Sequence, residues 1–74
     1  MIKLGKYQHF KGNFYQVLHL AKHSENEEVM VVYQPLYDND EGKREIWVRP
    51  LTMFDELIER EGKKFKRFVY IDNF

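Results

Sequence analysis

Short runs of β-branched and aromatic residues, separated by turn-forming residues, constrain the fold of this chain more than any other feature. The two longest runs span 14–22 and 28–37, and shorter runs span 44–49 and 65–71. Pro50 ends one run because proline cannot donate to a strand ladder. The pattern predicts antiparallel strands, and 74 residues leave room for a single domain, 1–74, with one small core.

Alternation within the long runs is imperfect. In 14–22, apolar side chains fall on both faces of a regular strand: Leu18 and Leu20 lie opposite Tyr15, Val17 and Ala21. A flat sheet with one solvated face would alternate cleanly. Strands that bend, bulge or switch sheets explain the pattern, and so does a dimer partner that covers the second face.

We therefore expect a mainly β fold: a small antiparallel domain of five or six strands, partly closed like an SH3-like barrel, with one short helical turn. The expected core consists of Tyr15, Val17, Leu18, Val31, Tyr33, Ile46, Val48, Phe54 and Val69. Residues 52–61 are ambiguous between helix and strand. The favoured interpretation is a helical turn over 51–55, then a strand over 56–60 that pairs with 66–71 through a hairpin closed at Glu61-Gly62.

Composition narrows the class of function. Twelve basic and twelve acidic residues give zero net charge, which argues against nucleic-acid binding by bulk charge but leaves a local basic patch open. The absence of cysteine excludes disulfides, thiolate metal sites and a cysteine nucleophile. No stretch approaches the roughly 20 apolar residues of a membrane span, and the first residues lack the apolar stretch of a secretion signal. We expect a soluble, cytoplasmic protein without a membrane partner.

Several short motifs, in this order and spacing, resemble a bacterial family catalogued as domain of unknown function 1653 (DUF1653). They are Tyr7-Gln8-His9-Phe10-Lys11-Gly12, Tyr15-Gln16-Val17, His23-Ser24-Glu25, Val31-Val32-Tyr33, Trp47-Val48-Arg49-Pro50, Met53-Phe54 and Arg67-Phe68. The chain departs from typical members in a longer loop over 38–45 and in Lys66, where members often have proline. The resemblance covers nearly the whole chain and implies a compact β domain, alone or attached to other modules. It implies no particular activity.

Trp47 and Arg49 are the first candidates for a binding surface. They alternate with Ile46 and Val48, so that if those two face the core, Trp47 and Arg49 project together from the other face. Three tyrosines could lie near them across adjacent strands: Tyr7, Tyr33 and Tyr37. Exposed Trp, Arg and Tyr side chains are typical of binding hot spots and suit base stacking. Alternatively, Trp47 has no ligand and belongs to a second hydrophobic core of a small barrel, with the Arg49 side chain lying over it.

Basic residues cluster late in the chain, interleaved with two phenylalanines. The cluster is Arg60, Lys63, Lys64, Phe65, Lys66, Arg67 and Phe68. Such a hairpin could contact a phosphate backbone. The usual meaning of such a run is a solvated hairpin that its charges keep soluble.

His23, Ser24 and Glu25 supply a base, a hydroxyl and an acid. Catalytic triads converge from separate parts of a fold, so we favour a loop in which Ser24 or Glu25 bonds local backbone N–H groups. His19 and His23 would lie about 13 Å apart along a strand, which argues against a shared metal ion with His9. We therefore expect no bound metal and no cofactor, and we assign no residue a catalytic role.

The sequence leaves three functions from different classes. The favoured one is a non-enzymatic binding module for a protein segment or a single-stranded nucleic acid. Its candidate ligand-binding residues are Tyr37, Trp47, Arg49, Arg67, His23 and Glu25. The second is a homodimeric assembly or structural protein, in which a second copy covers Val29, Val32 or Phe68, so that both monomer and homodimer stay open. The third is a hydrolase that uses His23 and Glu25, with or without His9.

Overall fold

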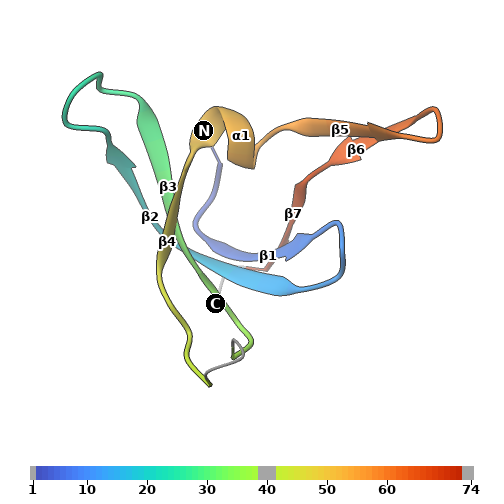
Figure 1. Cartoon of the computed structure of the whole chain (residues 1–74), viewed down its shortest axis with the longest axis horizontal. Helices are drawn as coiled ribbons and strands as arrows, with labels where there is room; N and C mark the ends of the chain where they lie inside the picture. Colours follow the sequence, from blue (N-terminus) through green and yellow to red (C-terminus); the bar gives the residue numbers. More distant parts are fainter. Residues whose placement is uncertain (1, 39–41, 73–74) are drawn as a thin grey trace.

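The computed structural model describes residues 2–38 and 42–72, which form a mainly β domain with two antiparallel sheets (Figure 1). The larger sheet has the order β4-β3-β2-β1-β7, with β1 (Gly5–His9), β2 (Phe14–Lys22), β3 (Val29–Pro35), β4 (Trp47–Pro50) and β7 (Phe68–Asp72). The smaller sheet pairs β5 (Leu57–Arg60) with β6 (Lys63–Lys66), and α1 (Leu51–Phe54) joins β4 to β5. Seven strands replace the expected five or six. The described part of the larger sheet is open, with β4 and β7 as its edges.

A bulge in β2 explains the imperfect alternation. The register with β3 shifts between Val17 and His19, which leaves Leu18 as the extra residue. Val17 is opposite Tyr33 before the shift, and Leu20 is opposite Val31 after it. Residues opposite each other in a ladder share a face, so Leu20 lies on the inner face, defined here as the face that carries Val17, Val31 and Tyr33. Of the explanations that the sequence left open, the structure shows a bulge.

The core is a set of aromatic rings packed on two valines. Its buried members are Tyr7, Val17, Val31, Tyr33, Phe54 and Phe68. The rings of Phe54 and Phe68 stack with centroids 4.1 Å apart, and Tyr7 and Tyr33 each meet Phe54 edge-on at 5.4 Å. α1 holds Phe54 in place through one helical turn, in which the Asp55 N–H donates to the Leu51 carbonyl at 2.8 Å.

Four expected core residues are buried, namely Val17, Val31, Tyr33 and Phe54, and two are half-buried, namely Tyr15 and Leu18. The other three were wrongly placed in the core: Ile46, Val48 and Val69 are 61%, 59% and 49% exposed. In β4, Trp47 and not Val48 is opposite the inward Tyr33, so the phase of the alternation is reversed. Val69 follows the buried Phe68 and therefore projects from the outer face.

The ambiguous segment contains both a helical turn and a hairpin. α1 confirms the turn after Pro50, and Glu61 and Gly62 close the β5–β6 hairpin with positive φ angles of 53° and 79°. β5 pairs with β6, so that of the expected partner range 66–71 only Lys66 takes part, opposite Leu57. The ladder goes no further because the chain changes direction at Arg67. The Arg67 N–H donates to the Glu56 carbonyl at 3.0 Å, and its own carbonyl accepts the Phe10 N–H at 2.9 Å. After that break, β7 pairs with β1 at the far side of the sheet (Figure 1).

The expected acidic turn over 38–42 and the longer loop around it include residues 39–41, which lie outside the described residues. Within 2–38 and 42–72, no helix has the length and apolar character needed to cross a membrane.

Candidate functional site

An aromatic strip runs across the inner face of the sheet and onto the β6 strand. Its members, in spatial order, are Trp47, Tyr37, Tyr15, Phe68, His9, Phe10 and Phe65. From Tyr37 onward, successive ring centroids lie 4.5–5.8 Å apart. These distances lie within the range of favourable aromatic contacts, so the rings form one connected row, in which Phe68 itself is buried.

Strand register produces this strip. Trp47 on β4 is opposite Tyr33 on β3, and His9 on β1 is opposite Phe68 on β7. Tyr15 on β2 is opposite the core residue Tyr7. Because partners across a ladder share a face, strands distant in sequence bring their rings to the same side.

At the β4 end of the strip, a depression of about 210 Å³ is lined by Tyr15, Tyr33, Tyr37, Trp47 and Arg49. Trp47 is 54% exposed and Tyr37 is 39% exposed. The structure therefore brings together three of the residues selected from the sequence, Tyr37, Trp47 and Arg49. It places them on the inner face, whereas the sequence analysis had placed Trp47 and Arg49 on the face opposite the core.

Arg49 lies at the centre of the strip. The central guanidinium carbon is 5.7 Å from the centroid of the Phe68 ring, within the range of a cation–π contact. The side chain is half-buried, so the cation is partly shielded from water while it faces the strip. A guanidinium held in this way is suited to contact an anion or a second planar group.

His9 supplies a second polar group beside Phe68, with the two rings 4.9 Å apart. Its Nδ1 accepts the Lys11 backbone N–H at 3.2 Å, so the neutral ring carries its proton on Nε2 and can donate from there. Burial lowers the pKa of His9 below 6.5, and the positive charges of Arg67, Arg49 and Lys11 lower it further. The neutral form of His9 is therefore favoured at neutral pH.

Arg67 lies at the junction of β6 and β7, where its backbone bonds to two different segments. One terminal nitrogen donates to the Glu56 Oε2 at 3.1 Å, and the side chain keeps 27% of its surface exposed. Its Nε is buried and has no hydrogen-bond partner among the described residues. The Arg67 backbone thus lies beside Phe10, the residue after His9, whereas Tyr37 and Trp47 line the depression at the other end of the strip.

The Tyr15 and Tyr37 hydroxyl oxygens lie 2.9 Å apart and share a hydrogen bond. Burial raises the pKa of Tyr15 above its usual value of 10, and the hydrogen bond to Tyr37 raises it further. Tyr15 therefore stays protonated at neutral pH and adds no negative charge to the strip.

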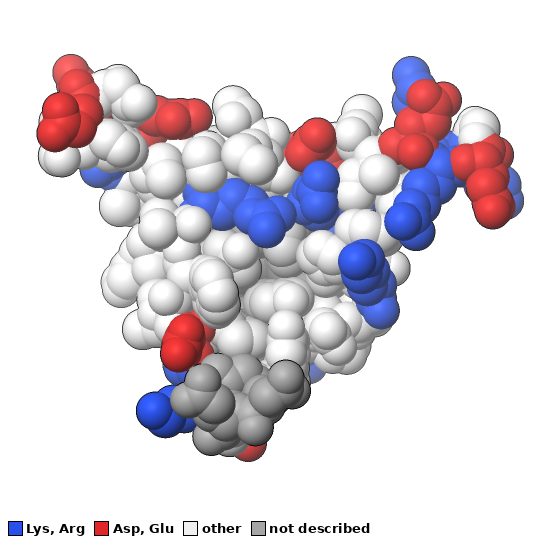
Figure 2. Space-filling model, viewed as in Figure 1, with Lys and Arg blue, Asp and Glu red and all other residues white. Residues whose placement is uncertain are grey.

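Charge on this side of the molecule is arranged locally, despite the zero sum. Figure 2 shows Lys and Arg side chains in a band across the middle of the viewed face, from beside β4 to the β5–β6 hairpin. Asp and Glu side chains gather mainly toward the ends of the molecule, and an uncharged, hollowed area borders the band (Figure 2). A cationic band beside an uncharged area is compatible with a ligand that carries both anions and rings.

His23 and Glu25 lie elsewhere, in the loop between β2 and β3, and both are exposed. The His23 Nδ1 accepts the Glu25 backbone N–H at 3.1 Å, and the Asn26 Oδ1 accepts the Glu28 N–H at 2.8 Å. The expected bonding to local backbone is present, but His23 and Asn26 provide it in place of Ser24 and Glu25. In residues 2–38 and 42–72, no group of three His, Asp or Glu side chains is placed to hold a metal ion.

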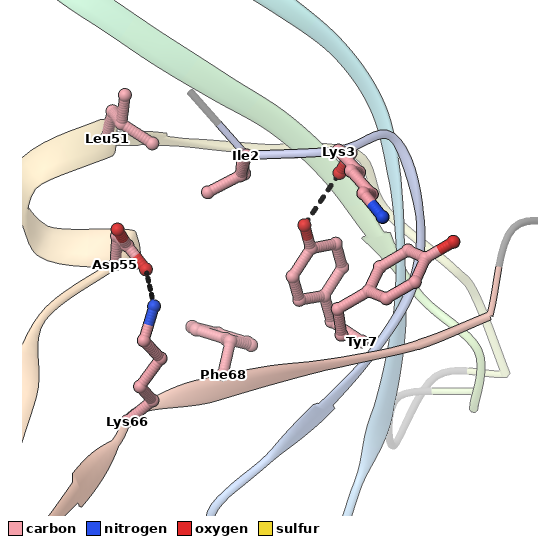
Figure 3. A pocket seen from close by; sticks show the side chains of 8 residues that line it. Ile2, Lys3, Tyr7, Leu51, Asp55, Lys66 and Phe68 are labelled. Carbon is pink, nitrogen blue, oxygen red and sulfur yellow. Dashed lines mark hydrogen bonds and ion pairs between the residues drawn. The ribbon is translucent and has the colours of Figure 1, made fainter.

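A larger depression, of about 530 Å³, lies between the N-terminal segment, α1 and β7 (Figure 3). Its walls include the apolar side chains of Ile2, Leu51 and Phe68. Three of its polar side chains are engaged within the chain: Lys66 pairs with Asp55 at 2.9 Å, and the Tyr7 hydroxyl donates to the Lys3 carbonyl at 2.7 Å (Figure 3). We place the candidate site on the strip, because Arg49 and His9 present their polar groups there beside exposed rings.

Sequence reasoning considered His9 only as a metal ligand or a catalytic residue. The available signal was its position: it ends a strand just before the Lys11-Gly12 turn, and that turn supplies the N–H that fixes its tautomer. The meeting of His9 and Arg49 at the Phe68 ring had no signal in the sequence, because it depends on β7 pairing with β1.

The fold and this surface define a small, open β domain with an aromatic and cationic inner face. The chain belongs to the DUF1653 family, described as a protein family of unknown function, whose family model matches residues 5–70. It is similar to the crystal structure of a DUF1653 protein from Bordetella bronchiseptica, with 32% sequence identity and a TM-score of 0.85. That similarity covers 99% of this chain and 91% of the other. No curated protein matches the chain.

Proposed function

We propose that this chain is a non-enzymatic binding module that holds an extended partner against the aromatic strip. The contact residues in this proposal are Tyr37, Trp47, Arg49 and Arg67. The observation that carries it is the depression at the β4 end, where an exposed tryptophan, an exposed tyrosine and a half-buried arginine converge. These are the residue types that dominate binding energy at interfaces.

The partner in this proposal is a protein segment or a single-stranded nucleic acid, because both can present planar groups and anions to an open face. The open, curled sheet over an aromatic core supports a comparison with SH3-like modules, which bind ligands on their surface. A bacterial setting is supported by the Bordetella relative. A cytoplasmic location stays a prediction from the sequence.

Backbone NMR tests this proposal directly. The labelled protein is titrated with a pool of short single-stranded oligonucleotides and, separately, with a pool of short peptides. Amide shifts confined to the strip are the expected result with at least one pool, and an unchanged spectrum with both would contradict the proposal.

A pair of variants sharpens the test. Trp47→Ala removes the exposed ring from the inner face, whereas Val48→Ala removes an equally exposed apolar side chain from the outer face of the same strand. We expect Trp47→Ala to weaken binding about tenfold or more and Val48→Ala to leave it unchanged. An equal loss of affinity in both variants would show that the inner face of β4 is not the binding surface.

A homodimer is a second candidate, favoured by one observation. β4 is an edge strand of the larger sheet, so a strand of a second copy could pair with it. Ile46, just before β4, and Val48, within it, are both more than half exposed. Of the residues expected under a second copy, Phe68 is 3% exposed and is covered by its own chain, and Val29 and Val32 are half-buried. A monomeric mass in light scattering at high concentration would exclude this candidate.

A further inference from the structure

We infer that His9, Arg49 and Arg67 form a phosphate site and that the ligand of the strip is a single-stranded nucleic acid. The inference rests on the proposed binding function and names its ligand class. It assigns phosphate contacts to the three polar side chains and base stacking to the exposed rings of Trp47 and Tyr37.

The first argument is the grouping of positive charge. Arg49 lies over Phe68 at 5.7 Å, and His9 lies against the same ring at 4.9 Å. Arg67 precedes Phe68 in the chain, and its carbonyl accepts the Phe10 N–H at 2.9 Å, so its backbone lies beside the residue that follows His9. The positive charges of Arg67 and Arg49 both lower the pKa of His9, in agreement with this placement. His9 is neutral at pH 7 and Arg67 is paired with Glu56 at 3.1 Å, so the positive charge that a bound anion would meet here is chiefly that of Arg49.

The second argument is the direction of hydrogen bonding. The Nδ1 of His9 is occupied by the Lys11 N–H, so the ring offers its Nε2–H. Guanidinium groups offer only donors. The three side chains together therefore offer donors to a ligand, and a phosphate group offers only acceptors at its oxygens.

The third argument favours a nucleic acid over an acidic peptide as the ligand. Further cations lie over the rings at the β6 end of the strip, with Arg60 5.3 Å and Lys11 5.9 Å from the Phe10 centroid. Cations thus lie over two rings of the strip, Phe68 at its centre and Phe10 toward its β6 end, which interleaves positive charge with the aromatic side chains. Every nucleotide carries both a ring and an anion, whereas a peptide carries them on separate residues. Such interleaving is typical of surfaces that bind single strands, whose bases are free to stack.

The first experiment compares two small ligands that differ only in the phosphate. Thymidine and thymidine monophosphate are each titrated into the protein, and the imidazole signals of His9 are followed by NMR. The monophosphate is expected to shift these signals and to raise the pKa of His9, because a bound anion favours the imidazolium form. Thymidine is expected to shift Trp47 and Tyr37 only. Identical effects of the two ligands on His9 would overturn the phosphate site.

The second experiment uses charge variants and a thymidine oligonucleotide of about six nucleotides, within the usual site size of such domains. Arg49→Gln and His9→Gln remove groups of the site, and Lys22→Gln removes one charge from an exposed position at the far end of β2. We expect Arg49→Gln to weaken binding about tenfold and to lower the salt slope of log K by about 0.7, the value for one phosphate contact. His9→Gln is expected to weaken binding about threefold, as loss of one hydrogen bond predicts. Lys22→Gln is expected to change neither quantity.

Equal losses in Arg49→Gln and Lys22→Gln would show attraction by general charge and would overturn the site. His9→Gln keeps the test valid if Arg49→Gln fails to give a folded amide spectrum. An acidic peptide that contains tyrosine provides the remaining comparison. If the peptide shifts the strip and the oligonucleotide does not, this inference fails while the proposed binding function stands. If neither shifts the strip, both fail.

Discussion

The guanidinium of Arg49 and the ring of Phe68 meet across the opening of the five-stranded sheet, with 5.7 Å between the guanidinium carbon and the ring centroid. Arg49 belongs to β4 and Phe68 to β7, the two edge strands of that sheet. A side-chain contact therefore joins the edges where the described structure has no backbone ladder. The same contact places a cation over the core and beside the candidate ligand surface.

Arg49→Lys tests how much this contact stabilises the fold. Lysine keeps the charge but loses the planar group that lies over Phe68, so we expect the free energy of unfolding to fall by about 0.5–1 kcal/mol. Urea denaturation measures the change. Arg44→Lys is the matched control, because Arg44 pairs with Asp38 at an exposed site, where the same substitution should cost less than about 0.5 kcal/mol. Equal costs would show that the Phe68 contact contributes nothing specific.

Phe54→Ala tests the aromatic core. The Phe54 ring is 1% exposed and stacks on Phe68 at 4.1 Å, so its removal should cost about 3–5 kcal/mol and leave much of the chain unfolded at room temperature. The neighbouring Met53 is 50% exposed, and Met53→Ala should change stability by about 0.5 kcal/mol at most. Circular dichroism under increasing urea gives both values. A cooperative, near-native transition for Phe54→Ala would contradict the packing described above.

The lowered pKa of His9 predicts how stability depends on pH. An unfolded chain protonates His9 near pH 6.5, whereas the folded chain resists protonation until a lower pH. The unfolded state therefore binds more protons as the pH falls below about 6.5, and the folded state loses stability in that window. Above about pH 7.5 both states hold His9 neutral, and its titration has no effect.

His9→Gln isolates this effect from the other titrating groups. We expect the difference in melting temperature between wild type and His9→Gln to be constant above about pH 7.5 and to shift against the wild type between about pH 6.5 and 5.5. Differential scanning fluorimetry at matched ionic strength is sufficient. Parallel curves over the whole range would mean that His9 has an unperturbed pKa in the folded protein.

The β5–β6 turn offers a prediction about backbone conformation. Glu61 and Gly62 both have positive φ angles, as the two central residues of a type I′ turn require. A Cβ atom on Gly62 would meet no atom within 4 Å, so Gly62→Ala should destabilise by about 1–2 kcal/mol through backbone strain alone. Glu61→Asn should stabilise by a few tenths of a kcal/mol, since asparagine tolerates positive φ better than glutamate does. Chemical denaturation measures whether each variant gains or loses free energy of unfolding. The same change in Gly62→Ala and Glu61→Asn would contradict the turn type.

The sequence predicted the class of fold because local signals determine it. The β-rich runs, the turn at Glu61-Gly62, the helical turn after Pro50 and the bulge in 14–22 each had a local cause, and each is present. The phase of β4 was wrong because Ile46 and Val48 are more apolar than Trp47 and Arg49 in a strand of only four residues. Pairing with Val31 and Tyr33 decides the phase, and that pairing is not local.

Only the part of the candidate site that depends on local patterns could be predicted from the sequence. Tyr37, Trp47 and Arg49 are close in sequence and do share a depression. His9 joins the strip because β7 returns to pair with β1, which places His9 opposite Phe68. The Arg67 carbonyl meets the Phe10 N–H because the chain turns between β6 and β7. Local patterns do not contain that return, so the polar end of the strip required the structure.

The open edge of the sheet has a mechanical consequence. A closed barrel fixes its diameter through an unbroken ring of backbone hydrogen bonds, and widening it would break several of them at once. Here no described backbone ladder joins β4 to β7, and side-chain packing spans the opening instead, with Arg49 over Phe68 and the Phe54 ring of α1 stacked on the same Phe68 ring. We therefore expect the spacing between β4 and β7 to change more easily than any distance along the strands. The domain could then bind ligands of different thickness without partial unfolding.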